Sequence, residues 1–272
     1  MKLKYLIAAF SIIILIVILV TVLLPIFFSE SGSQLNFRFL TIPLLIFMAV
    51  LLIIMSLFIF FNYRLFSLLE REDWPALAYY LEQKVYIKRR YTYRNVRLLA
   101  SSYLVISDYS SVLNLEAKTH LAKDSLIPKN ILVFGAARIL SGGYAEAALF
   151  FRKYQKKCKD SDRYWVRWYI GFSNLLAGDF GASELEFTSL AVSCGDAVIS
   201  GLSAYFIANS LEKKSQDPQK CRAALQQGRT RVVSALKNIR GWKKEIEKMG
   251  TDIHTAIIRK YIDAAGVWLF TE

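Results

Sequence analysis

Residue types that carry most enzyme chemistry are scarce in this chain of 272 residues. It contains only two histidines, His120 and His254, and three cysteines, Cys158, Cys194 and Cys221. The cysteines show no CxxC spacing and the two histidines are remote from each other, so the sequence predicts no metal site. We expect free thiols in a reducing compartment and partly exposed surface histidines.

Catalytic motifs are also missing. The Gly142-Gly143 pair follows no predicted strand and precedes no Gly-Lys-Ser/Thr sequence, so it does not read as a phosphate-binding loop. No nucleophile is paired with a base, and no pair of carboxylates stands out from ordinary helix-surface charge. The sequence therefore predicts no enzyme activity, no catalytic residue, no bound cofactor and no small-molecule substrate.

Charge is absent from two long stretches near the N-terminus. Residues 5–29 and 39–63 are each 25 residues without a charge, whereas about 20 residues cross the hydrocarbon core of a bilayer. A cleaved signal peptide has a shorter apolar region than the first stretch. Neither stretch contains glycine, so a GxxxG contact is not expected. The sequence predicts two transmembrane helices, at about residues 5–28 and 39–63, that form a hairpin anchor.

Positive charge flanks the predicted hairpin on one side. Lys2 and Lys4 precede the first span, and a series of bases from Arg64 to Arg97 follows the second, whereas the short connection holds one acid and one base. By the positive-inside rule, both chain termini and the whole domain after residue 63 are cytoplasmic. The expected localisation is the inner membrane of a bacterium. The net charge of +13 is then mainly a signal of topology.

A period of about 35 residues recurs after the hairpin. An aromatic residue opens a helical stretch in each unit, at Trp74, Tyr109, Tyr144 and Phe180. Small and bulky residues also take fixed places in the two clearest units: Gly135, Ala147 and Phe151, and then Gly171 and Phe187. Two antiparallel helices approach closely only where one presents a small residue, and aromatic side chains fill the space between successive units.

This pattern resembles the tetratricopeptide repeat (TPR), a helix–turn–helix unit of about 34 residues. The resemblance covers residues 64–212 and implies an all-α protein, although other α-solenoids of similar period stay open. We expect a transmembrane hairpin at 1–63, a TPR-like α-solenoid at 64–212, and a degenerate repeat with C-terminal capping helices at 213–272. In detail, the sequence predicts that residues 64–71 continue the second span and that helices cover 218–240 and 251–270.

The resemblance also implies a binding surface, because the first helix of each TPR pair lines a concave groove that receives peptides or partner helices. The groove positions here are Arg94, Arg97, Lys129, Trp165, Trp168 and Phe172. Such a groove suits a ligand with an acidic end and an apolar segment, and Trp and Arg are frequent binding hot spots. The alternative is that Trp165 and Trp168 are core residues between repeats.

The sequence thus favours a membrane-anchored scaffold or adaptor whose solenoid binds a protein partner in a membrane-associated complex. One alternative is a structural subunit of an envelope, secretion or flagellar machine in which the hairpin itself packs. Another is a regulator that binds lipid or nucleic acid through basic clusters. Lys88, Arg89 and Arg90 suit contact with anionic lipid headgroups. Nucleic acid is the less favoured partner, because no motif of a known reader is present.

Overall fold

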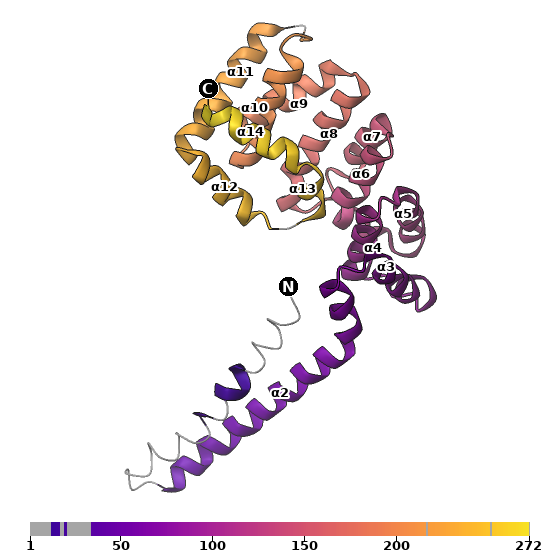
Figure 1. Cartoon of the computed structure of the whole chain (residues 1–272), viewed down its shortest axis with the longest axis vertical. Coiled ribbons are helices and arrows are strands. Elements are labelled where there is room, and N and C mark those ends of the chain that lie inside the picture. The colour runs from indigo at the N-terminus through magenta and orange to yellow at the C-terminus, as the bar shows by residue number, and fades with distance from the viewer. Residues whose placement is uncertain (1–11, 17–18, 21–33, 216, 251, 272) are drawn as a thin grey trace. The chain divides into compact units, whose positions relative to one another are not determined.

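Helix is the only regular secondary structure in the part of the chain that the structure describes. This confirms the all-α prediction. The computed structural model describes residues 12–16, 19–20, 34–215, 217–250 and 252–271 (Figure 1). The chain divides into two compact units, Met1–Tyr80 and Leu81–Glu272.

The first unit is built on α2 (Gln34–Glu70), one continuous helix of 37 residues. Its segment Val50–Glu70 has the length and composition to cross a membrane, and only 6% of its most apolar stretch is buried. The other predicted span, residues 5–28, lies outside the described residues apart from 12–16 and 19–20. The described chain therefore contains one candidate span, where the sequence predicts two.

A short turn joins α2 to α3 (Trp74–Glu82), which continues into the π-helical segment η1 (Gln83–Ile87). Asp73 caps α3, since its carboxylate Oδ1 accepts a hydrogen bond of 3.1 Å from the backbone N–H of Ala76. As the sequence predicts, no break separates the apolar part of α2 from its last turns, which run through Arg64. The chain thus leaves the candidate span as helix and reverses at a capped turn.

The second unit is a series of helix pairs in which each pair packs on the next (Figure 1). The pairs are α4 (Tyr93–Val105) with α5 (Tyr109–Lys123), α6 (Ile131–Leu140) with α7 (Tyr144–Tyr154), α8 (Arg163–Ala177) with α9 (Phe180–Ser193), and α10 (Ala197–Phe206) with α11 (Pro218–Leu236). Short segments complete the connections: η2 (Asp124–Leu126), η3 (Pro128–Asn130), η4 (Asp160–Asp162) and η5 (Ile207–Leu211).

Four turns share one backbone geometry. In each, a residue with positive φ precedes the start of the next helix: Glu72 (φ 54°), Ser107 (φ 60°), Gly142 (φ 86°) and Gly178 (φ 83°). The following residue then donates its backbone N–H to the carbonyl five residues earlier, at 2.9–3.2 Å, in the pairs 73–68, 108–103, 143–138 and 179–174. This is the hydrogen bond of a Schellman motif. The predicted aromatic residues Trp74, Tyr109, Tyr144 and Phe180 each begin the helix that follows.

Close helix contacts also recur. Gly135 of α6 faces the ring of Phe151 so closely that a Cβ atom there would lie 2.0 Å from the ring Cζ. Phe151 in turn stacks on Tyr169 of the next pair, with ring centroids 5.4 Å apart. The next unit repeats the arrangement, because Gly171 faces Phe187, and Phe187 stacks on Phe206 at 5.6 Å. Ala147 is fully buried in α7.

The C-terminal helices differ in their bounds from the prediction. The expected helix over residues 218–240 ends at Leu236, because Lys237 takes a positive φ of 65°. Asn238 then starts α12 (Ile239–Lys248), its side-chain oxygen accepting a bond of 3.0 Å from the backbone N–H of Gly241. The sequence predicted no separate helix here.

The expected capping helix over residues 251–270 is two helices, α13 (Ile253–Ile257) and α14 (Arg259–Thr271). They break at Ile258, whose side chain is 1% exposed. Figure 1 shows α14 lying across α10, and α13 contacts α6. The end of the chain therefore turns back onto the first helices of several pairs.

Candidate partner-binding surface

The residues expected to line a groove lie in α4 and α8 and, for Lys129, in η3 directly before α6. The basic residues Arg94 and Lys129 are exposed. The aromatic residues are not: Trp165, Trp168 and Phe172 are 7%, 0% and 5% exposed. The structure therefore separates the six positions into an accessible basic part and a covered aromatic part.

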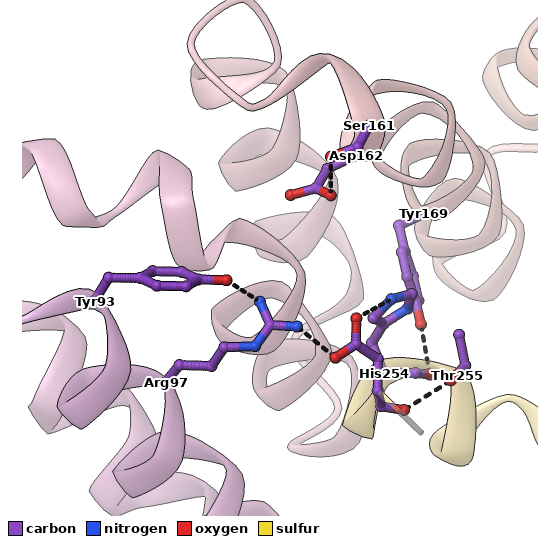
Figure 2. Close-up of polar contacts among 8 residues, drawn as sticks. Tyr93, Arg97, Ser161, Asp162, Tyr169, His254 and Thr255 are labelled. Carbon is purple, nitrogen blue, oxygen red and sulfur yellow. Dashed lines mark hydrogen bonds and ion pairs between the residues drawn. The ribbon is translucent and has the colours of Figure 1, made fainter. Parts of the chain in front are cut away.

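The cover is the chain's own C-terminal segment, residues 252–262, which we call the C-terminal strap. At its beginning, Asp252 Oδ1 lies 2.6 Å from Arg97 Nη2. Arg97 also donates through Nη1 to the hydroxyl of Tyr93, at 2.8 Å (Figure 2). The strap thus brings a C-terminal part of the chain into contact with α4. Arg97 already forms an ion pair with an acid of the same chain, Asp252.

His254 is the strap residue that packs on α8. Its carbonyl accepts a hydrogen bond of 3.0 Å from the hydroxyl of Tyr169, as Figure 2 shows. Its ring meets Trp165 edge-on, with centroids 5.3 Å apart. The residue is only 3% exposed, so the expectation of a surface histidine is wrong for His254. It holds for His120, whose side chain is 54% exposed.

The pKa of His254 is lowered to about 4, mainly by burial; the charge of Asp252 raises the pKa and the charge of Arg97 lowers it. The ring atom Nδ1 has no hydrogen-bond partner among the described residues. A protonated ring would bring a charge and an unpaired donor into an apolar contact. His254 is therefore neutral in the folded protein at neutral pH, and acid disfavours the strap.

Aromatic packing holds the rest of the strap. Tyr261 lies against Phe172 and Phe206, with centroid distances of 5.6 Å and 5.2 Å. Trp168 stacks on Phe172 at 5.0 Å beneath this contact. Trp165 and Trp168 are thus buried core residues. This is the alternative to a groove position that the sequence left open.

Trp242 of α12 locks the strap to the helix pairs, and the sequence pattern did not single it out. Its indole N–H donates to the carbonyl of Ile262 at 3.2 Å. Gly201 of α10 and Gly266 of α14 leave room for the ring, since a Cβ at either position would lie 2.8 Å or 2.5 Å from its atoms. Gly201 and Gly266 are both far from Trp242 in sequence, so no local pattern signals this contact.

The remaining positions that the sequence singled out are a basic cluster and three cysteines. Lys88, Arg89 and Arg90 are exposed in the connection between η1 and α4. The thiols of Cys158, Cys194 and Cys221 are free, and burial raises the pKa of Cys194 to about 11. Among the residues that the structure describes, no group of three or more His, Cys, Asp or Glu side chains could hold a metal ion.

Comparison with known proteins places the chain among treponemal sequences. A family described as "Uncharacterised Treponema protein" matches residues 111–271, which spans α5 to α14 and so includes the strap. A protein of Treponema pallidum (strain Nichols), described as an uncharacterized protein, is 28% identical over 233 residues, which is 83% of this chain and 74% of that protein. No solved structure matches the chain.

Proposed function

The chain belongs to this family of uncharacterised Treponema proteins, and we propose that it is a membrane-anchored scaffold whose helical repeats bind a protein partner. It would hold that partner in a membrane-associated complex and carry out no reaction itself. The repeats would be a TPR-like α-solenoid. The anchor would be a two-helix hairpin with both termini in the cytoplasm.

One observation carries the proposal. The first helices α4 and α8 receive a peptide segment, here the strap of the same chain. The segment brings an acid to Arg97 and a ring to Trp165. A surface that holds an acidic and aromatic segment in cis has the chemistry to hold a similar segment in trans. We therefore expect a partner segment with an acidic residue followed by aromatic or apolar side chains.

The repeat geometry supports the TPR-like interpretation. The shared Schellman turns and the two glycine–phenylalanine contacts recur at the predicted period. The anchor is supported by α2, whose apolar side chains are widely exposed, such as Phe60 at 76% and Phe61 at 72%. Large exposed apolar surface of this kind fits the interior of a bilayer.

Two measurements on the full chain test the proposal. A reporter that is active only outside the cytoplasm, fused to the C-terminus, should give no signal. A photo-crosslinker in place of Arg94, on the accessible part of α4, should capture one partner repeatedly, whereas the same group in place of the exposed Asn114 on α5 should not. Asp252→Lys should increase the capture, because it releases the strap.

A strong reporter signal would overturn the cytoplasmic orientation. Equal capture from positions 94 and 114, or capture that does not respond to Asp252→Lys, would overturn partner binding on the surface that the strap covers. The two measurements are independent, so the anchor and the binding surface can fail separately.

A further inference from the structure

Each connection that leads into α4, α6 or α8 carries exposed bases. Helix pairs in series place the connections between pairs along one side and the turns within pairs along the other. The connections 88–92, 124–130 and 155–162 hold seven exposed bases. Six of them make up what we call the basic edge: Lys88, Arg89, Arg90, Lys129, Lys156 and Lys157. The seventh, Lys159, lies over the ring of Tyr93. The turns 106–108, 141–143 and 178–179 hold no Lys or Arg. The next pair of helices differs, because its turn holds Lys213 and Lys214 and the connection 194–196 before it holds no base.

All three connections contact α4. The Nζ atom of Lys159, from the third connection, lies 4.3 Å from the ring centroid of Tyr93 at the start of α4. The segment η3, which contains Lys129, packs on α4 as well. The carbonyl of Arg90 accepts a hydrogen bond of 3.0 Å from the side chain of Asn95 in α4. The basic edge is therefore one surface, although its residues come from three parts of the sequence.

The acids on this edge are engaged by other groups. Asp124 pairs with His120, Asp160 pairs with Arg163, and Asp162 accepts a hydrogen bond from Ser161. In the described part of the chain, none of the six bases of the basic edge forms an ion pair with a carboxylate. The edge thus keeps a net positive charge.

Helix dipoles do not account for this asymmetry. A base is stabilised at the C-terminal end of a helix and an acid at the N-terminal end. Each connection and each turn joins one C-terminal end to one N-terminal end, so the dipoles act equally on both edges. The six bases of the basic edge are exposed on neighbouring connections, and such a group of like charges attracts a polyanionic surface.

We infer that the basic edge binds the anionic headgroups of the bilayer in which the chain is anchored. This rests on the proposed membrane anchor. Lys88 follows Glu70, the last residue of the candidate span, by 18 residues. Covalent attachment over so short a segment gives the edge a high effective concentration at the headgroups. Four of the six bases are lysines, compact point charges that suit headgroups without demanding a fixed bidentate geometry.

Nucleic acid fits the edge less well. Binding to single strands combines bases with aromatic rings that are free to stack. Tyr93, at the start of α4, has Lys159 over its ring and accepts a hydrogen bond from Arg97, so this ring is not free to stack on a base.

The test uses the full chain in nanodiscs, with lysine acylation read by mass spectrometry. In discs that contain phosphatidylglycerol, labelling of Lys88, Lys129, Lys156 and Lys157 should fall at least about threefold relative to pure phosphatidylcholine discs. The difference should vanish at about 1 M salt, where the Debye length is about 3 Å. Lys213 and Lys214 are the matched controls, because Lys214 lies 4.3 Å from the Phe180 ring centroid at the opposite edge.

A charge-reversal pair completes the design. Lys156→Glu with Lys157→Glu should abolish most of the lipid-dependent protection of Lys129, whereas Lys213→Glu with Lys214→Glu should leave it unchanged. Equal labelling in both discs would overturn the inference while the anchor stands. Protection by single-stranded RNA in phosphatidylcholine discs, without protection by phosphatidylglycerol, would overturn it in favour of nucleic acid. A chain that enters neither disc would overturn the anchor and the inference together.

Discussion

Single residues at the four shared turns show how the repeat tolerates sequence drift. Gly142 and Gly178 occupy the left-handed position without steric cost, but the equivalent Glu72 and Ser107 carry a Cβ there. For an L-residue other than glycine, this conformation costs about 1–2 kcal/mol. The turn geometry is thus imposed by helix packing at two positions and favoured by the residue itself at the other two.

We expect Ser107→Gly to raise the free energy of unfolding by about 0.5–1 kcal/mol, because the relief at positive φ exceeds the added entropy of the unfolded chain. Chemical denaturation of the full chain in detergent measures the change. Gly142→Ala is the reverse substitution at the equivalent position and should lower stability. A loss of stability in Ser107→Gly would contradict this account of the turn.

His254 makes stability depend on pH. Its pKa is about 4 in the folded chain and about 6.5 in the unfolded chain, so the unfolded state binds the proton more tightly. The stabilisation is complete above pH about 6.5 and is lost as the pH falls toward 4, by up to about 3 kcal/mol. Denaturation midpoints between pH 7 and 4.5 should fall for the wild type.

The matched variants isolate this effect. His254→Phe keeps a ring against Trp165 and should flatten the pH dependence over that range. His120→Phe changes an exposed histidine and should leave the dependence as it is in the wild type. An unchanged acid response in His254→Phe would assign it to other groups.

Helix pairs are held by contacts between a small residue and a ring, and two of these can be compared directly. A methyl group at Gly135 would lie 2.0 Å from Phe151, whose ring is also stacked on Tyr169 and cannot retreat. A methyl group at Gly171 would lie 3.0 Å from Phe187, so a small shift can relieve the contact.

We therefore expect Gly135→Ala to destabilise the chain by about 2 kcal/mol or more through overpacking. Gly171→Ala should be close to neutral, because the gain in helix propensity, about 1 kcal/mol, offsets a smaller clash. Thermal denaturation of the two variants in the same detergent measures the difference. Equal effects would show that the Gly135 contact relaxes as easily as the Gly171 contact.

Across the whole molecule, the pair of Arg97 and Asp252 joins residues 155 apart in the sequence. Through it the strap closes over the first helices of the repeats. Both side chains are partly exposed, at 22% and 48%, so the pair sets the position of the strap more than the stability of the fold. Whether the covered surface is accessible to a partner depends on this contact.

We expect Arg97→Asp to increase hydrogen exchange in residues 252–257, because it faces one carboxylate with another. The exchanged pair, Arg97→Asp with Asp252→Arg, should recover much of the protection. Asp263→Asn removes an ion pair with Arg259 that lies within α14, and it should leave exchange at 252–257 unchanged. Failure of the exchanged pair to recover protection would mean that the ion pair does not hold the strap.

Much of the fold follows from local pattern. Helical periodicity, the recurring aromatic residue at each helix start, and the uncharged stretch 39–63 within α2 are all patterns of neighbouring residues. The less local features were missed. Lys237 ends a helix at a positive φ that its residue type does not favour, and Trp242 lies in α12, a separate helix that the sequence pattern did not predict.

The sequence by itself determined that the chain is helical, where its capped turns lie, and where charge is absent or concentrated, because these depend on residues within one or two turns of each other. Only the tertiary structure decided which surfaces are free. Trp165 looks the same in sequence whether it lines an open groove or packs beneath His254. The three basic connections form one edge only once the helix pairs are stacked. Both outcomes rest on contacts between residues distant in sequence, which local patterns do not encode.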